Sequence, residues 1–197
     1  MPCRLGSVAS SAESSVRSEW SATGAVDVRI VAVLSRIAPA TALVTFATLP
    51  VFLVASLSVV MRPEIVITET RVGAAVAVNY LAAMLWSVPA GRITQRGGAR
   101  RGLRVGTALA VLGVGAVIAA AGWASIVLGM VLTGIATAFL QVAANLAIAD
   151  SVPPARLGLA YSVKQSAIPL ATLGAGLAVP IAAQVVPWRA VFVLVLL

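Results

Sequence analysis

The sequence predicts an all-α membrane protein, built from several helices that each cross the bilayer. Of its 197 residues, 60% are apolar and only 10% are charged, whereas a soluble domain usually carries about 25% charged residues. Four long stretches contain no charged residue: 37–61, 72–91, 105–149 and 165–188. Because a membrane-spanning helix needs about 20 such residues, these stretches predict a polytopic helical membrane protein and exclude a soluble enzyme.

The first 37 residues predict a cytoplasmic tail that leads into the bilayer. Residues 1–26 are rich in serine, alanine and scattered charge, which is typical of disordered segments, and they lack the early apolar region of a signal peptide. Apolar residues then recur at helical spacing, at Val26, Ile30, Val33, Leu34 and Ile37. We therefore expect a short amphipathic helix on the bilayer surface before the first span.

The first two spans are expected at about residues 38–60 and 72–90. The segment between them, from Arg62 to Arg71, holds two basic and two acidic residues. After the second span comes the arginine-rich junction, residues 91–104, with five arginines and no acidic residue. Because so many charges are costly in hydrocarbon, the junction is expected as a loop in water.

The next two spans share one uncharged stretch. Residues 105–149 are too many for a single span, and Gly122 and Ser125 favour a turn near the middle. We therefore expect spans at about 105–121 and 125–149.

The last two apolar segments lie at about 159–183 and 190–197, separated by a turn at Pro187. A helix over 190–197 extends only about 12 Å, against a hydrocarbon core of about 30 Å. The sixth span is therefore expected to be incomplete. We expect the chain to be a fragment, and the alternative is an incomplete or re-entrant segment that needs a partner.

Basic residues predict which ends of the spans face the cytoplasm. They gather in the N-terminal tail, in the arginine-rich junction and in segment 150–164, which lie on one side of the predicted topology. The other side carries the balanced segment 62–71, with Trp123 and Trp188 at the boundary where indole rings prefer to lie. We therefore expect an integral protein of the plasma (inner) membrane with a cytoplasmic N-terminus.

Composition argues against several other functions. Fourteen Lys and Arg against six Asp and Glu give a formal charge of +8, which would suggest nucleic acid in a soluble chain but is explained here by topology. The sequence has no histidine and one cysteine, Cys3, and it shows no catalytic or metal-ligand constellation. We expect no enzyme, no catalytic residue, no metal, no cofactor and no nucleic-acid partner.

Polar side chains inside the spans are candidates for a substrate cavity, because they are costly in hydrocarbon and often mark a pathway. Asn79 lies midway along the second span, and Gln141 and Asn145 share one face of the fourth. Lys164 and Gln165 lie at the start of the fifth. Two alternatives stay open: Gln141 and Asn145 could join helices by hydrogen bonds, and Lys164 could extend its amine to the membrane surface.

Small residues predict where helices approach closely, and prolines predict kinks. The small residues are Gly102, Gly106, Ala110 and Gly113 in the third span and Gly174 and Gly176 in the fifth. The prolines in or near spans are Pro50, Pro89, Pro169 and Pro180. We expect most of them to serve helix packing and static kinks.

The arginine-rich junction resembles a motif of the major facilitator superfamily. Between their second and third spans, these transporters carry Gly, three residues, Asp-Arg, any residue, Gly and then two basic residues. The matching positions are Gly91, Arg96, Gly98 and Arg100, with Gln95 in place of the aspartate, Ala99 in place of the first basic residue and Arg101 as an additional neighbour.

Two further segments are similar to the same family. The run Asp150, Pro153, Arg156 and Gly158 resembles one that follows its fourth span, and Trp188-Arg189 with Phe192 resembles the start of its sixth. The resemblance covers about residues 38–197. It implies the N-terminal half of a twelve-helix secondary transporter, which moves a small solute by alternating access between two halves. The lipid bilayer, a small-molecule substrate and the missing C-terminal six-helix half are the implied partners.

The resemblance also implies a gate built from charged residues. The gating set is Gly91, Gln95, Arg96, Gly98, Arg100, Arg101, Asp150 and Arg156. Arginines bind carboxylates or the negative ends of helices, and such contacts would latch the cytoplasmic side. The uncharged Gln95 is expected to weaken this latch, and Asp150 is expected to pair with Arg96 or Arg100. Two alternatives remain: arginines that only set topology, and a non-transporting membrane assembly or regulatory protein.

Overall fold

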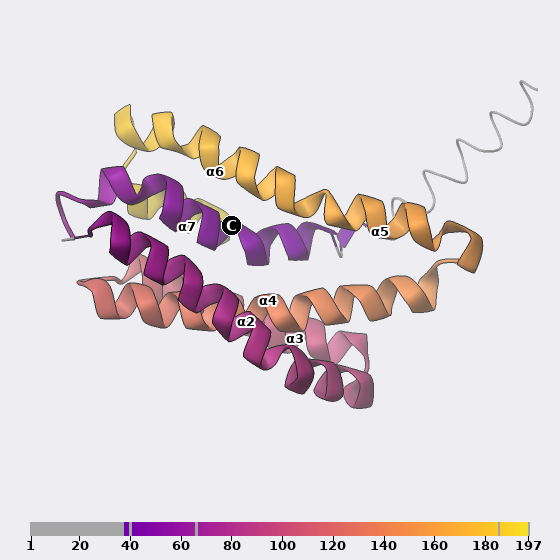
Figure 1. Cartoon of the computed structure of the whole chain (residues 1–197). Coiled ribbons are helices and arrows are strands. Elements are labelled where there is room, and N and C mark those ends of the chain that lie inside the picture. The colour runs from indigo at the N-terminus through magenta and orange to yellow at the C-terminus, as the bar shows by residue number, and fades with distance from the viewer. Residues whose placement is uncertain (1–37, 40, 66, 185, 197) are drawn as a thin grey trace, which may run out of the picture. The chain divides into compact units, whose positions relative to one another are not determined.

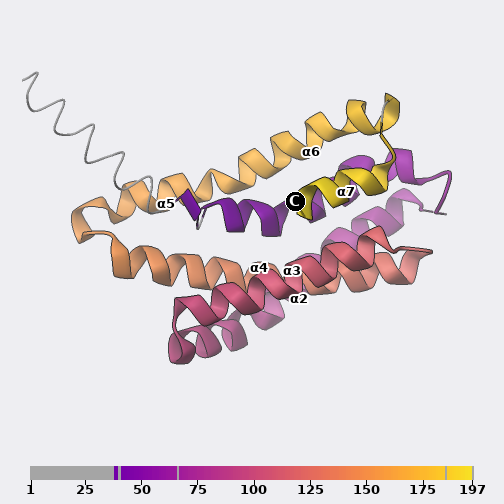
Figure 2. The same cartoon turned by 180° about the vertical axis from the view of Figure 1, so that it is seen from behind.

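The computed structural model describes residues 38–39, 41–65, 67–184 and 186–196. The expected N-terminal tail and amphipathic helix, residues 1–37, lie outside the described residues. Within the described residues, every regular element is a helix (Figures 1 and 2). The predicted all-α fold is confirmed.

Five described helices are long and apolar enough to cross a membrane. They are the first helix (Thr41–Met61), α2 (Glu69–Gly97), α3 (Ala99–Ile118), α4 (Trp123–Ser151) and a composite helix (Pro154–Gln184). The composite helix consists of the 3-10 turn η1 (Pro154–Arg156), α5 (Leu157–Gln165) and α6 (Ala167–Gln184). The shorter α7 (Trp188–Leu196) follows.

The arginine-rich junction is helical, so the expected loop over residues 91–104 is wrong. Helix α2 continues to Gly97 and α3 begins at Ala99. Arginine favours helices, and a helix does not have to end where the hydrocarbon ends. Only Gly98 separates α2 from α3, with a φ of 79° that glycine adopts without strain.

Helix α4 forms the centre of the packing. It runs beside both α2 and α3 (Figures 1 and 2), and Thr137 of α4 donates a hydrogen bond to the Ala47 carbonyl of the first helix at 3.2 Å. An apolar core joins the first helix, α3, α4 and α7 through buried side chains that include Leu57, Val117, Ile126 and Phe192.

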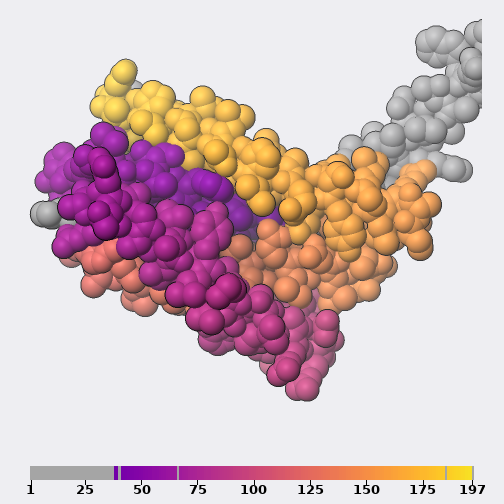
Figure 3. Space-filling model, in the orientation of Figure 1, coloured from indigo at the N-terminus to yellow at the C-terminus, as the bar shows by residue number. Residues whose placement is uncertain are grey.

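The outer faces of α2 and α6 are apolar. These two helices form much of the surface in Figure 3. Their large exposed side chains include Met84, Leu85 and Val88 of α2 and Leu170, Leu173 and Leu177 of α6. Such a surface would be unfavourable in water, and lipid tails provide an environment in which it is not.

Candidate functional site

Glycines let α4 approach both of its neighbours. A Cβ atom on Gly113 of α3 would lie 2.9 Å from the Thr133 backbone nitrogen, and one on Gly129 of α4 would lie 2.8 Å from the Gly113 carbonyl oxygen. A Cβ atom on Gly134 would overlap the Asn79 carbonyl oxygen of α2. These backbones therefore touch, as expected where small residues line helix interfaces in lipid.

The small residues of the third span pack as the sequence predicted, whereas those of the fifth do not. Gly102, Gly106, Ala110 and Gly113 are all buried. By contrast, a Cβ atom on Gly174 would meet only Leu49, at 3.6 Å, and one on Gly176 would have no neighbour within 4 Å.

Asn79 joins two helices in this structure, and its place in a substrate cavity stays a prediction. Its side-chain amide donates to the Met130 carbonyl and to the Thr133 hydroxyl, both at 2.9 Å. The residue is 3% exposed. Because Gly134 brings α2 and α4 together at this level, the amide faces a neighbouring helix.

Lys164 and Asn145 form a polar pair between α5 and α4. The Lys164 ammonium donates to the Asn145 side-chain oxygen at 2.8 Å. Lys164 is 3% exposed. The alternative in which its amine extends to the membrane surface stays open. Of the other cavity candidates, Gln165 is exposed and Gln141 is half-buried.

A second hydrogen bond joins the same two helices beside this pair. Tyr161, one turn before Lys164 on α5, donates to the Asn145 carbonyl at 3.4 Å. Val44 of the first helix, Ala144 of α4 and Ala167 of α6 form a buried apolar cluster. Ala144 directly precedes Asn145, and Ala167 follows Lys164 by three residues. The structure thus brings Asn145 and Lys164 together, with Gln141 one turn away along α4.

Pro169 explains why α5 ends directly after Lys164. A proline lacks the amide hydrogen, and its ring clashes with the carbonyl four residues earlier, here that of Gln165. Helix α5 ends at Gln165 and α6 begins at Ala167. Pro89 and Pro180, in contrast, lie inside continuous helices.

The gating residues lie at the end of the bundle where α2 meets α3 and α4 meets η1 (Figure 1). Gln95, Arg96, Gly98, Arg100, Arg101 and Asp150 are exposed, whereas Gly91 and Arg156 are partly buried. Within the described part of the chain, Asp150 forms no ion pair with Arg96 or Arg100. The expected pairing is therefore not made in this structure.

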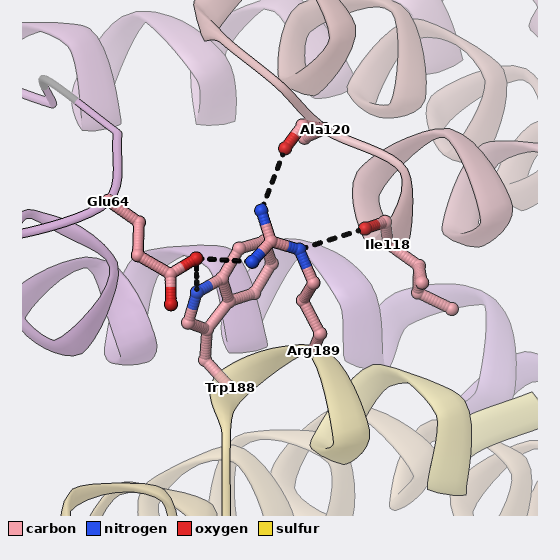
Figure 4. Close-up of polar contacts among 5 residues, drawn as sticks. All are labelled: Glu64, Ile118, Ala120, Trp188 and Arg189. Carbon is pink, nitrogen blue, oxygen red and sulfur yellow. Dashed lines mark hydrogen bonds and ion pairs between the residues drawn. The ribbon is translucent and has the colours of Figure 1, made fainter.

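A cluster at the opposite end of the bundle centres on Glu64 and Arg189 (Figure 4). The Arg189 guanidinium forms an ion pair with the Glu64 carboxylate, and the indole of Trp188 donates to the same carboxylate at 3.1 Å. Arg189 also donates to the carbonyls of Ile118, at 3.2 Å, and Ala120, at 3.0 Å. We call these five residues the Glu64–Arg189 cluster.

The Glu64–Arg189 cluster holds together three segments of the chain that lie at the ends of helices. It joins the segment after the first helix, the carboxyl end of α3 and the start of α7. The guanidinium also lies 4.3 Å from the centre of the Trp188 ring, at a distance suited to a cation–π interaction. Sequence pattern alone does not predict the pairing across 125 positions, although the predicted topology puts both charges on the same side.

The chain matches the family model described as Major Facilitator Superfamily over residues 33–197. No curated protein matches the chain. Within the described residues, no group of three or more metal-ligating side chains occurs.

Proposed function

The chain belongs to the major facilitator superfamily, and from this membership we propose that it forms the N-terminal half of a secondary transporter for a small solute. It is an integral membrane protein of a transporter family, with five helices fit to span a bilayer. In the proposed mechanism, two six-helix halves rock around a site near the bilayer midplane and open it to each side in turn. The second half would come from the same polypeptide or from another.

The observation that carries this proposal is the polar group on α4 and α5. Asn145 and Lys164 are joined by a 2.8 Å hydrogen bond, and the half-buried Gln141 lies one turn away on α4. Polar groups at membrane depth are favourable only where they contact protein or line a water-filled cavity. We assign these three residues to the wall of the solute pathway.

The two ends of the bundle support different roles in such a cycle. The Glu64–Arg189 cluster ties three connections together at one end. At the other end, the exposed Arg96 and Arg100 have no ion-pair partner among the described residues. We propose that the arginine-rich end is cytoplasmic, with a cytoplasmic N-terminus in the plasma (inner) membrane, in keeping with the distribution of basic residues. There the arginines would contact the second half when that side closes.

Replacing Arg96 with alanine tests the gating role. We expect Arg96→Ala to lower solute uptake several-fold, because the latch loses a charged group that can bind a carboxylate or a helix end. Membrane insertion should not change, since the other arginines of the junction still set the topology. The measurement is uptake by proteoliposomes that contain the protein expressed at full length from its own gene, with a panel of small solutes.

Arg104→Ala is the matched control, because Arg104 is an exposed arginine of the same junction outside the family motif. It should retain uptake close to that of the unmodified protein. Equal uptake by the Arg96→Ala protein and the unmodified protein would refute the gate.

A further inference from the structure

Lys164 is a buried cation held by a neutral partner. Its ammonium carries three hydrogen-bond donors, and the structure gives it one acceptor, the Asn145 amide oxygen at 2.8 Å. The residue is 3% exposed. An amide oxygen satisfies one donor but carries no negative charge, so this partner does not compensate the cation.

No acidic side chain in the described part of the chain compensates this charge. Glu64 pairs with Arg189, and Glu69 pairs with Arg62. The third acid of these residues, Asp150, is exposed at the end of α4 and forms no ion pair. Burying a cation without an anion is costly, so the arrangement favours an anion that comes from outside the described residues.

The pair is open on one side. Asn145 is exposed although its partner is buried, and Gln141 on the same face of α4 is half-buried. The Tyr161 hydroxyl contacts the Asn145 carbonyl at 3.4 Å. An anion that approaches over Asn145 would therefore meet the exposed amide first. Lys164 lies behind it, and among the described residues its ammonium has one hydrogen-bond acceptor.

We propose that Lys164 is the anion-binding group of this pathway and that the transported solute is a small organic anion, such as a carboxylate. This inference rests on the transport function proposed above. The ammonium supplies the charge, Asn145 holds it in position, and Gln141 provides a neutral hydrogen-bonding group at the entrance.

A purely structural role for Lys164 makes a different prediction. If the residue only ties α5 to α4, Lys164→Gln should behave like the unmodified protein, because a glutamine amide also donates to the Asn145 oxygen. If the charge matters, Lys164→Gln should lose the attraction for anions and Lys164→Arg should keep it. The two substitutions therefore separate the charge from the hydrogen bond.

The test uses a single reporter thiol beside the pair, in the protein expressed at full length. Cys3 is the only cysteine of these 197 residues, so Cys3→Ser with Gln141→Cys leaves one thiol in this chain, and cysteines elsewhere in the polypeptide are replaced with serine. Its reaction rate is measured with two methanethiosulfonate reagents, one with a sulfonate and one with a trimethylammonium group. A unit charge about 8 Å away in water-like surroundings changes the ratio of these rates about fivefold. We expect the sulfonate-to-ammonium ratio to fall by about that factor in Lys164→Gln and to be kept in Lys164→Arg.

Each outcome has a defined meaning. If both reagents react and Lys164→Gln leaves the ratio unchanged, the anion site is refuted while the transport function stands. If neither reagent reaches the thiol from either side, both proposals fail. Should Lys164→Gln not fold, the protein that retains Lys164 is measured in salt between about 0.01 and 1 M, where the Debye length falls from about 30 to about 3 Å; a ratio that does not decrease with salt overturns the inference.

Discussion

Replacing Gly134 with alanine is expected to lower the free energy of unfolding of the helix bundle by about 2–3 kcal/mol, near the upper end for an overpacked interior. The added Cβ atom would overlap the carbonyl oxygen of Asn79 and lie 3.0 Å from the Ala82 Cβ atom. A backbone oxygen cannot rotate away as a side chain can, so α2 must move away from α4. That movement would also lengthen the two hydrogen bonds of Asn79 to α4.

Gly115→Ala provides the matched control, since a Cβ atom on Gly115 in α3 would have no neighbour within 4 Å. It should be neutral or stabilise the helix by up to about 1 kcal/mol, because alanine favours helices over glycine. Unfolding of the purified protein in detergent, followed by thermal or denaturant titration, measures both variants. Equal stability of the two would show that α2 and α4 are not packed through Gly134.

Removing the Arg189 side chain is expected to lower the free energy of unfolding by about 2–3 kcal/mol. The half-exposed ion pair with Glu64 contributes little by itself. The larger loss comes from the hydrogen bonds to two backbone carbonyls, those of Ile118 and Ala120. Because the Arg189 side chain is 40% exposed, solvent screening reduces each bond to about 1 kcal/mol, below the range for fully buried bonds from a charged group. Loss of the contact with Trp188 adds about 0.5–1 kcal/mol.

Arg62→Ala is the control for Arg189→Ala. Arg62 also pairs with a glutamate, but the side chains of Arg62 and Glu69 are 43% and 88% exposed, so its loss should cost at most about 1 kcal/mol. Arg189→Lys should recover only part of the stability, because one ammonium does not reproduce the guanidinium fork. A destabilisation by Arg189→Ala no greater than that by Arg62→Ala in the same unfolding assay would contradict the stabilising role of the Glu64–Arg189 cluster.

The fold class follows from the sequence because a helix in hydrocarbon must be built almost entirely from uncharged residues. Long uncharged stretches are required to cross a bilayer, and they are visible without any knowledge of tertiary contacts. The ends of the helices are less visible. The arginines of residues 91–104 indicate where the chain leaves the hydrocarbon, but they say nothing about whether the helix continues, and only Gly98 interrupts it.

The candidate site was predictable in part. Helical spacing puts Gln141 and Asn145 on one face, but it does not indicate which side of α2 Asn79 faces, since that depends on the approach allowed by Gly134. The bond between Lys164 and Asn145 depends on how α5 packs on α4, across 19 positions. The pairing of Glu64 with Arg189 depends on the complete bundle, which brings three connections together.

Alternating access requires the polar face of α4 to belong to a pathway that opens to both sides of the membrane. Its most direct test is the labelling of Gln141→Cys, in the Cys3→Ser background, by a membrane-impermeant maleimide in right-side-out and in inverted vesicles that contain the full-length protein. Alternating access predicts labelling in both preparations, and a solute that favours one state should slow labelling from the opposite side. Labelling from one side only under all solute conditions, or from neither side, would contradict the proposed transporter.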